Sequence, residues 1–112
     1  MHELGITRNI VAIVGEASKG KPVRRVTLEI GKLSGVVADA IVFCFDAVAH
    51  GTVVEGATLE ILEIEGRARC EICCAEFCVP GFFAACACGS RRLAHIAGEE
   101  LNIKTIEIEE VA

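Results

Sequence analysis

Two segments of the chain carry apolar residues at the spacing of an amphipathic helix. In residues 4–17 the expected buried face consists of Ile6, Ile10, Ile13, Val14 and Ala17. Residues 37–48 repeat this spacing with Val37, Ile41, Cys44, Phe45 and Val48. Gly20 and Pro22 end the first helix, because glycine accepts the left-handed backbone of a helix terminus and proline cannot continue a helix.

Three other segments alternate apolar and polar residues with the period of two that is typical of a strand. They cover residues 23–30, 57–65 and 101–108. The second and third contain a phase slip, as where Leu59 and Ile61 share one face and Leu62 and Ile64 share the other. A β-bulge is the usual way in which a strand absorbs such a slip.

The order of these elements predicts an α+β fold. A strand–helix–strand unit forms a parallel strand pair, so both helices would pack on one face of a three-stranded mixed sheet. The last strand returns to this sheet after a cysteine-rich insert. We therefore predict an α/β domain of residues 1–66 plus 98–112 and a small, zinc-ribbon-like module of residues 67–97 that is looped out of it.

Composition narrows the class of protein. The chain of 112 residues is 53% hydrophobic but only 4% aromatic, so its core must be aliphatic. Sixteen acidic against eleven basic residues give a net charge of −5, which argues against a nucleic-acid partner. Charges interrupt the apolar stretches before the roughly 18 residues of a membrane span, and the first residues lack a basic secretory signal. We expect a cytoplasmic protein without membrane contact.

The cysteines are concentrated in the insert, where six of the seven lie between Cys70 and Cys88. Disulfides are rare in the cytoplasm, whereas structural zinc favours four thiolates in ligand pairs on tight turns. Cys70 and Cys73 have the usual two-residue gap, and Cys86 and Cys88 form a second pair with a gap of one. These four are the predicted Zn(II) ligands. The reserve ligands are Cys74, Cys78 and His95.

Zinc would hold a module with little apolar material of its own. Its expected small core consists of Phe77, Phe82 and Phe83. Two other classes of protein stay open on the cysteines alone. One is a zinc-ribbon adaptor that binds protein or nucleic acid. The other is a thiol redox protein that uses Cys70 and Cys73 or the adjacent pair Cys73 and Cys74.

The amino terminus offers a second metal site. With His2 in second position, the amine of Met1, the amide of His2 and its imidazole are all within reach of one ion. Nickel(II) and copper(II) accept such planar nitrogen donors, whereas zinc prefers a tetrahedron. Glu3 could add an oxygen or orient the imidazole.

Four motifs together resemble one family. They are Met1-His2-Glu3-Leu4, the loop from Ile30 to Gly35, Phe43-x-Phe45-Asp46, and the late cysteine module that ends in Cys88-Gly89-Ser90. This combination, at matching length, resembles the HypA/HybF hydrogenase maturation family of nickel-incorporation metallochaperones.

The resemblance implies a non-enzymatic carrier that binds transient Ni(II) and structural Zn(II). It places nickel on His2 with neighbouring backbone nitrogens and Glu3 nearby, and zinc in two Cys-x-x-Cys knuckles. Cys70 and Cys73 match the first knuckle, but Ala85 stands where the second knuckle begins, so Cys86 joins Cys88 by proximity. The implied partners are a nickel-insertion GTPase and the hydrogenase large subunit precursor, and a homodimer is possible.

Overall fold

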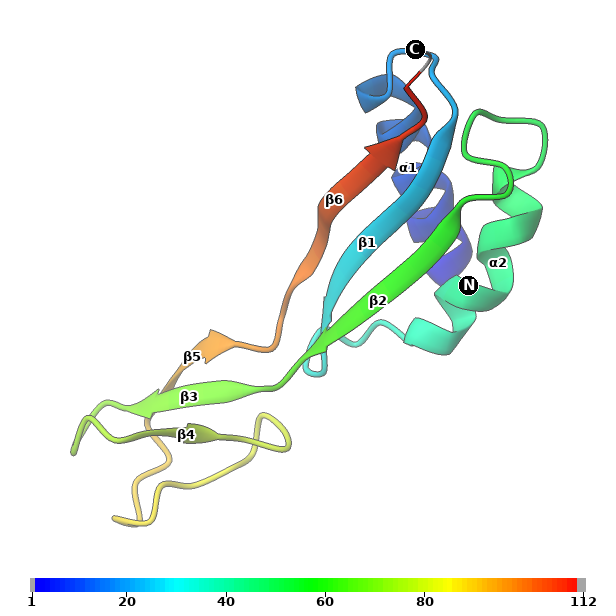
Figure 1. Cartoon of the computed structure of the whole chain (residues 1–112). Helices are drawn as coiled ribbons and strands as arrows, with labels where there is room; N and C mark the ends of the chain where they lie inside the picture. Colours follow the sequence, from blue (N-terminus) through cyan, green and yellow to red (C-terminus); the bar gives the residue numbers. More distant parts are fainter. Residues whose placement is uncertain (1, 111–112) are drawn as a thin grey trace. The chain divides into compact units, whose positions relative to one another are not determined.

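The structure is a computed structural model that describes residues 2–110. Its elements follow the predicted order, with three short strands in the insert (Figure 1). They are α1 (His2–Ala17), β1 (Val23–Gly31), α2 (Ala38–Ala49), β2 (Thr58–Ile64), β3 (Arg67–Cys70), β4 (Glu76–Cys78), β5 (Leu93–Ala97) and β6 (Leu101–Ile108). Both helices and the three long strands confirm the α+β prediction.

The main sheet has the strand order β2-β1-β6. β1 and β2 run parallel, because the N–H of Val23 donates to the carbonyl of Val53 and that of Lys32 donates to Ile64. β6 runs in the opposite direction, since Glu109, just after β6, donates to Pro22, just before β1. The sheet is therefore mixed, as predicted, and Figure 1 shows both helices on the same side of it.

The buried face of α1 differs from the predicted one. Thr7, Ile10, Val11 and Val14 are buried, whereas Ile13 is 55% exposed and Ala17 is exposed. Thr7 can lie inward because its hydroxyl donates to the carbonyl of Glu3 at 2.6 Å, so no polar atom is left without a partner. A prediction that uses apolar residues alone therefore could not place Thr7 on the buried face.

α2 buries one side against the core. Ile41, Phe45 and Ala49 are at most 2% exposed, and Cys44 and Val48 are half-buried, as the periodicity predicts. The prediction was wrong for Val37, which precedes the helix as its N-cap and is 57% exposed. Val26 and Leu28 of β1, and Val54 and Ala57 before β2, are buried in the same unit as the helices. Apart from Phe45, the buried apolar side chains of this unit are therefore aliphatic.

The phase slip of β2 is visible in its burial. Leu59, Ile61, Leu62 and Ile64 are all half-buried, whereas Glu60 and Glu63 between them are exposed. The associated β-bulge stays a prediction.

The insert forms a second sheet of order β4-β3-β5, and both of its strand pairs are antiparallel. By contacts, the described chain divides into two compact units. The helical unit comprises residues 2–28, 37–62 and 102–110, and the cysteine unit comprises residues 29–36 and 63–101.

The core of the cysteine unit is small. Its buried members are Leu33, Ala68 and Val79, and Phe77, Ala84 and Leu93 pack against them. The prediction was right for Phe77 but wrong for Phe82 and Phe83, which are 51% and 95% exposed. Their place is taken by Leu33, which comes from the loop after β1 and could not be assigned to the insert from local sequence. Within residues 2–110, no helix is long and apolar enough to cross a membrane.

Candidate metal-binding sites

Two tight turns bring four cysteines together. Cys70 ends β3, and the N–H of Cys74 donates back to its carbonyl at 2.9 Å, which folds Cys73 toward Cys70. The second turn is closed by two hydrogen bonds at 2.8 Å, from Cys86 to the Ser90 carbonyl and from Gly89 to the Cys86 carbonyl. Gly89 has φ +94°, a conformation that favours glycine.

The sulfurs of Cys70, Cys73, Cys86 and Cys88 lie within 4.8 Å of one another. The Cys70–Cys88 distance is 3.7 Å and the Cys73–Cys86 distance is 3.5 Å. Thiolates at the usual Zn–S distance of about 2.3 Å in a tetrahedron would be about 3.8 Å apart. The donor set and its spacing therefore fit a tetrahedral metal, despite the one-residue gap of the second pair.

The four thiols are not equivalent. Backbone N–H groups of Cys73 and Ile72 point at the sulfur of Cys70, at 3.5 and 3.4 Å, and lower the pKa of this thiol to about 6. The N–H of Cys88 also favours a thiolate at Cys86. Burial and the neighbouring sulfurs outweigh it and raise the pKa of Cys86 to about 12. Without a metal, Cys70 is thus an anion at neutral pH and Cys86 holds its proton.

The reserve ligands do not join this cluster. Cys74 and Cys78 are exposed, and Cys78 accepts a hydrogen bond from Arg67 at 3.5 Å. The ring of His95, on β5, packs edge-on against Phe82 with centroids 5.0 Å apart. Its buried Nδ1 has no hydrogen-bond partner within residues 2–110.

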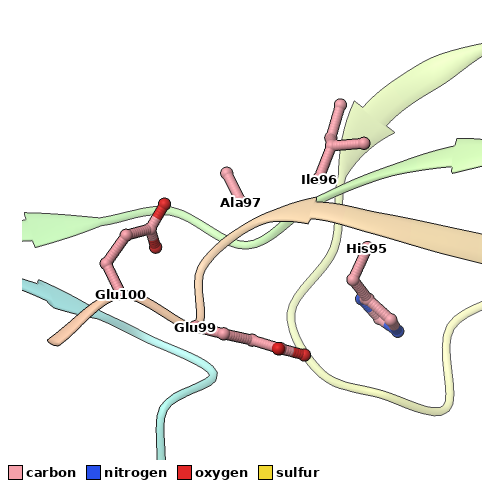
Figure 2. Close-up of a pocket in the computed structure, with 5 residues that line it drawn as sticks. All are labelled: His95, Ile96, Ala97, Glu99 and Glu100. Atoms are coloured by element: carbon pink, nitrogen blue, oxygen red, sulfur yellow. The ribbon is translucent and has the colours of Figure 1, made fainter.

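His95 faces a separate pocket of about 280 Å³ in the cysteine unit (Figure 2). The pocket is also lined by Ile96, Ala97, Glu99 and Glu100. Glu100 accepts a hydrogen bond from the N–H of Gly98 at 2.7 Å, and Figure 2 shows its carboxylate pointing away from the His95 ring. Within the part of the chain that the structure describes, His95 does not belong to any cluster of three or more metal-ligating side chains.

At the amino terminus, His2 is the first residue of α1 and is exposed. Glu3 follows it, and its carboxylate accepts the N–H of Val37 at 3.2 Å. The N–H of Glu3 itself and this bond from Val37 lower the pKa of the Glu3 carboxyl. The amine of Met1, also a predicted nickel ligand, lies outside the described residues. Sequence reasoning missed Val37, because a backbone N–H leaves no signal in the side-chain pattern.

Comparison with known proteins identifies the family. A model of the family described as hydrogenase/urease nickel incorporation, metallochaperone, HypA, matches residues 1–108. The hydrogenase maturation factor HypA of Trichormus variabilis is 62% identical over 111 residues, covering 99% of this chain and 98% of the relative. That of Geobacter metallireducens is 48% identical over 110 residues, covering 97% and 100%.

The fold agrees with solved structures. The nickel metallochaperone HypA of Helicobacter pylori superposes with a TM-score of 0.68 at 21% identity, covering 95% of this chain and 96% of the other. The chain therefore belongs to the HypA family of nickel-incorporation metallochaperones for hydrogenase and urease. This confirms the resemblance drawn from the sequence motifs.

Proposed function

We propose that this protein carries Ni(II) at its amino terminus and delivers it for hydrogenase maturation. The ligands are the amine of Met1, the imidazole of His2 and the backbone nitrogens beside it, with Glu3 next to the ion. One observation carries the assignment to this end of the chain. His2 is exposed at the start of α1, directly before a carboxylate that a backbone N–H holds in place.

The chemistry of this end suits a carrier. Planar nitrogen donors favour nickel over zinc, so the site distinguishes between these two ions. The ligands must be deprotonated to bind Ni(II), so acidification or partner contact can release the ion. The N-terminus of a helix also disfavours a cation, an effect that the adjacent carboxylate of Glu3 offsets.

We further propose that the four clustered cysteines bind structural Zn(II). Four sulfur donors leave no open coordination position, which is typical of a structural site. A cysteine unit with only a few buried apolar residues gains much of its stability from such a cross-link. Thiolates bound to zinc are poor disulfide partners, so this assignment also speaks against the redox alternative.

Catalysis is not part of this function, because a carrier binds and releases its cargo unchanged. The partners that we propose are the nickel-insertion GTPase and the hydrogenase large subunit precursor. Seven cysteines without a disulfide fit the reducing cytoplasm as the place of action.

The nickel site is tested by calorimetry on untagged protein with a free amino terminus. The wild type should bind about one Ni(II) per chain, and His2→Ala should lower the affinity at least tenfold. His50→Ala is the matched control, because His50 is another exposed histidine at a helix end, and it should bind nickel as the wild type does. Wild-type affinity in His2→Ala would contradict the assignment.

Zinc is tested by elemental analysis of the same preparations. The wild type and His2→Ala should both contain about one zinc per chain, whereas Cys70→Ser should contain little. A chain that holds iron or no metal at the cysteines would contradict this part of the proposal.

A further inference from the structure

The helix α2 has two faces of different character. Its buried face contains Ile41, Phe45 and Ala49. Its opposite face is exposed and is hereafter called the α2 outer face. It consists of Asp39, Val42, Phe43, Asp46 and Ala47, at the i, i+3, i+4, i+7, i+8 spacing of one helical stripe.

Phe43 has no role in the fold of the chain. Its side chain is 87% exposed and its neighbour Val42 is 53% exposed, whereas Phe45 fills the core two positions on. Scattered exposed apolar residues are ordinary, but an aromatic ring beside a valine at the middle of a helix is the kind of anchor that buries itself in a partner's pocket. In the motif Phe43-x-Phe45-Asp46, Phe45 is thus a core residue, whereas the stability of the fold does not explain Phe43.

The charges of the α2 outer face restrict what can cover it. Asp39 and Asp46 lie one helical turn before and after Phe43, and α2 contains no lysine or arginine. A second copy of the chain, packed face to face, would bring like charges together, and an anionic membrane would be repelled. A protein with an apolar pocket edged by lysine or arginine is complementary to this face in both hydrophobicity and charge.

The position of α2 adds a functional reason. Its N-cap, Val37, donates its N–H to Glu3, the residue next to His2. All of these residues belong to the helical unit. A protein seated on the α2 outer face therefore comes to rest beside the proposed nickel site.

We propose that the α2 outer face, with Phe43 between Asp39 and Asp46, is the surface on which the nickel-receiving protein docks. The contact region of that protein is an apolar pocket edged by lysine or arginine. The inference rests on the proposed function, since it assigns the surface that positions the acceptor for transfer.

The first test replaces the wild-type allele by Phe43→Ser in the organism that encodes the chain. Hydrogenase activity and the nickel content of its large subunit should fall at least fivefold. The purified variant should bind Ni(II) with wild-type affinity, because Phe43 is not one of the proposed ligands. Phe83→Ser is the matched control, since Phe83 is 95% exposed in the cysteine unit, and it should support wild-type hydrogenase activity.

Charge is tested in the same assay. The double variant Asp39→Lys, Asp46→Lys should lower hydrogenase activity as Phe43→Ser does. The matched control Glu16→Lys reverses an exposed charge on α1 and should leave hydrogenase activity unchanged. Wild-type hydrogenase activity in Phe43→Ser, or in the double aspartate variant, would overturn the docking surface.

A photoreactive phenylalanine at position 43, activated in intact cells, identifies the occupant. A cross-link to a protein that takes up Ni(II) from this chain in vitro, through a segment that combines apolar residues with lysine or arginine, supports the proposal. A cross-link to a second copy of this chain, to lipid, to a protein that takes up no nickel, or to no protein overturns it. If the wild type bound no nickel in calorimetry, the proposed function would fail, and the cross-link would still decide whether the surface docks a basic partner.

Discussion

At the scale of single residues, Glu3 joins two segments that are 34 positions apart in the chain. Its carboxylate caps the N–H of Val37, at the start of a helix that has no side-chain cap of its own. The same carboxylate stands beside the proposed nickel ligand His2. Glu3 therefore both positions the first turn of α1 and supplies negative charge where a cation is to bind.

The pKa of Glu3 gives a pH dependence. Its own N–H and that of Val37 lower the pKa below the ordinary 4.5, so the ionised carboxyl stabilises the fold above that pH and this contribution is lost as the pH falls through the lowered value. We expect the melting temperature of the wild type to fall more steeply on acidification below about pH 4.5 than that of Glu3→Gln. Thermal unfolding followed by circular dichroism measures this. Glu16→Gln controls for the removal of one negative charge from α1, and equal slopes for Glu3→Gln and the wild type would contradict the role of Glu3.

Cys70 and Cys86 make a second prediction at this scale. The fold lowers the pKa of Cys70 from the ordinary 9.0 to about 6. The ionised thiol therefore stabilises the metal-free fold fully above pH 9, and this contribution is lost as the pH falls toward 6. Cys86 is shifted the opposite way, to about 12, so its neutral form stabilises the fold below pH 9. Thiolate absorbance at 240 nm in metal-free protein should show a step near pH 6 that Cys70→Ser removes and Cys78→Ser keeps. A step that persists in Cys70→Ser would assign the early thiolate to another cysteine.

At the scale of elements, the loop between β1 and α2 belongs to the cysteine unit, although the insert begins some thirty residues later. Its Leu33 is 9% exposed and packs with Ala68 and Val79. We expect Leu33→Ala to cost about 2–4 kcal/mol of unfolding free energy, since it removes a large part of a small core. Ile72→Ala, at a site 60% exposed in the same unit, should cost within about 0.5 kcal/mol. Denaturant unfolding of both variants compares them, and equal costs would contradict the role of Leu33.

Alanine substitutions at two glycines should change the free energy of unfolding in opposite directions. A Cβ at Gly31, the last residue of β1, would lie 2.0 Å from the carbonyl oxygen of Gly98, a backbone atom that cannot turn aside. Gly31→Ala should therefore destabilise the fold by at least about 2 kcal/mol. Gly5 lies within α1 with open space around it, so Gly5→Ala should stabilise the fold by up to about 1 kcal/mol. Chemical unfolding measures both, and a neutral Gly31→Ala would show that the close approach is not required.

Periodicity predicted the elements whose burial is one-sided and long, and it failed where contacts come from elsewhere in the chain. α2 follows the apolar pattern, because it packs one face on the core. In β1 the alternation is incomplete, since Thr27 is buried between Val26 and Leu28. The strands of the insert have three to five residues, too few for a period, and their pairing is fixed by the cysteine turns. Ile13 was misplaced because the buried stripe of α1 consists of Thr7, Ile10, Val11 and Val14, and a pattern of apolar residues does not include the threonine.

At the scale of the whole molecule, the candidate sites were easier to predict from the sequence than the contacts that surround them. Metal-ligand spacing is local, so Cys70 and Cys73 were expected to lie together, and the structure places Cys86 and Cys88 with them. The choice of Cys86 over Cys74 depends on the turn that Gly89 closes, a three-dimensional feature. The exposure of Phe43 could not be predicted either. An aromatic residue on a helix is expected in the core, unless the structure shows that other residues of the helix already fill it.

The two units should respond differently to removal of the metal. The helical unit has an extensive aliphatic core, whereas the cysteine unit buries few apolar side chains and depends on its sulfur cluster. After chelation, hydrogen exchange should therefore accelerate at least tenfold in β3, β4 and β5 while protection in α1 and α2 persists, and added Zn(II) should restore it. Cys78→Ser, outside the cluster, should behave as the wild type does. Protection of β3 to β5 that survived complete metal removal would show that the core around Leu33 suffices, and the cysteines would then need another purpose than holding the unit together.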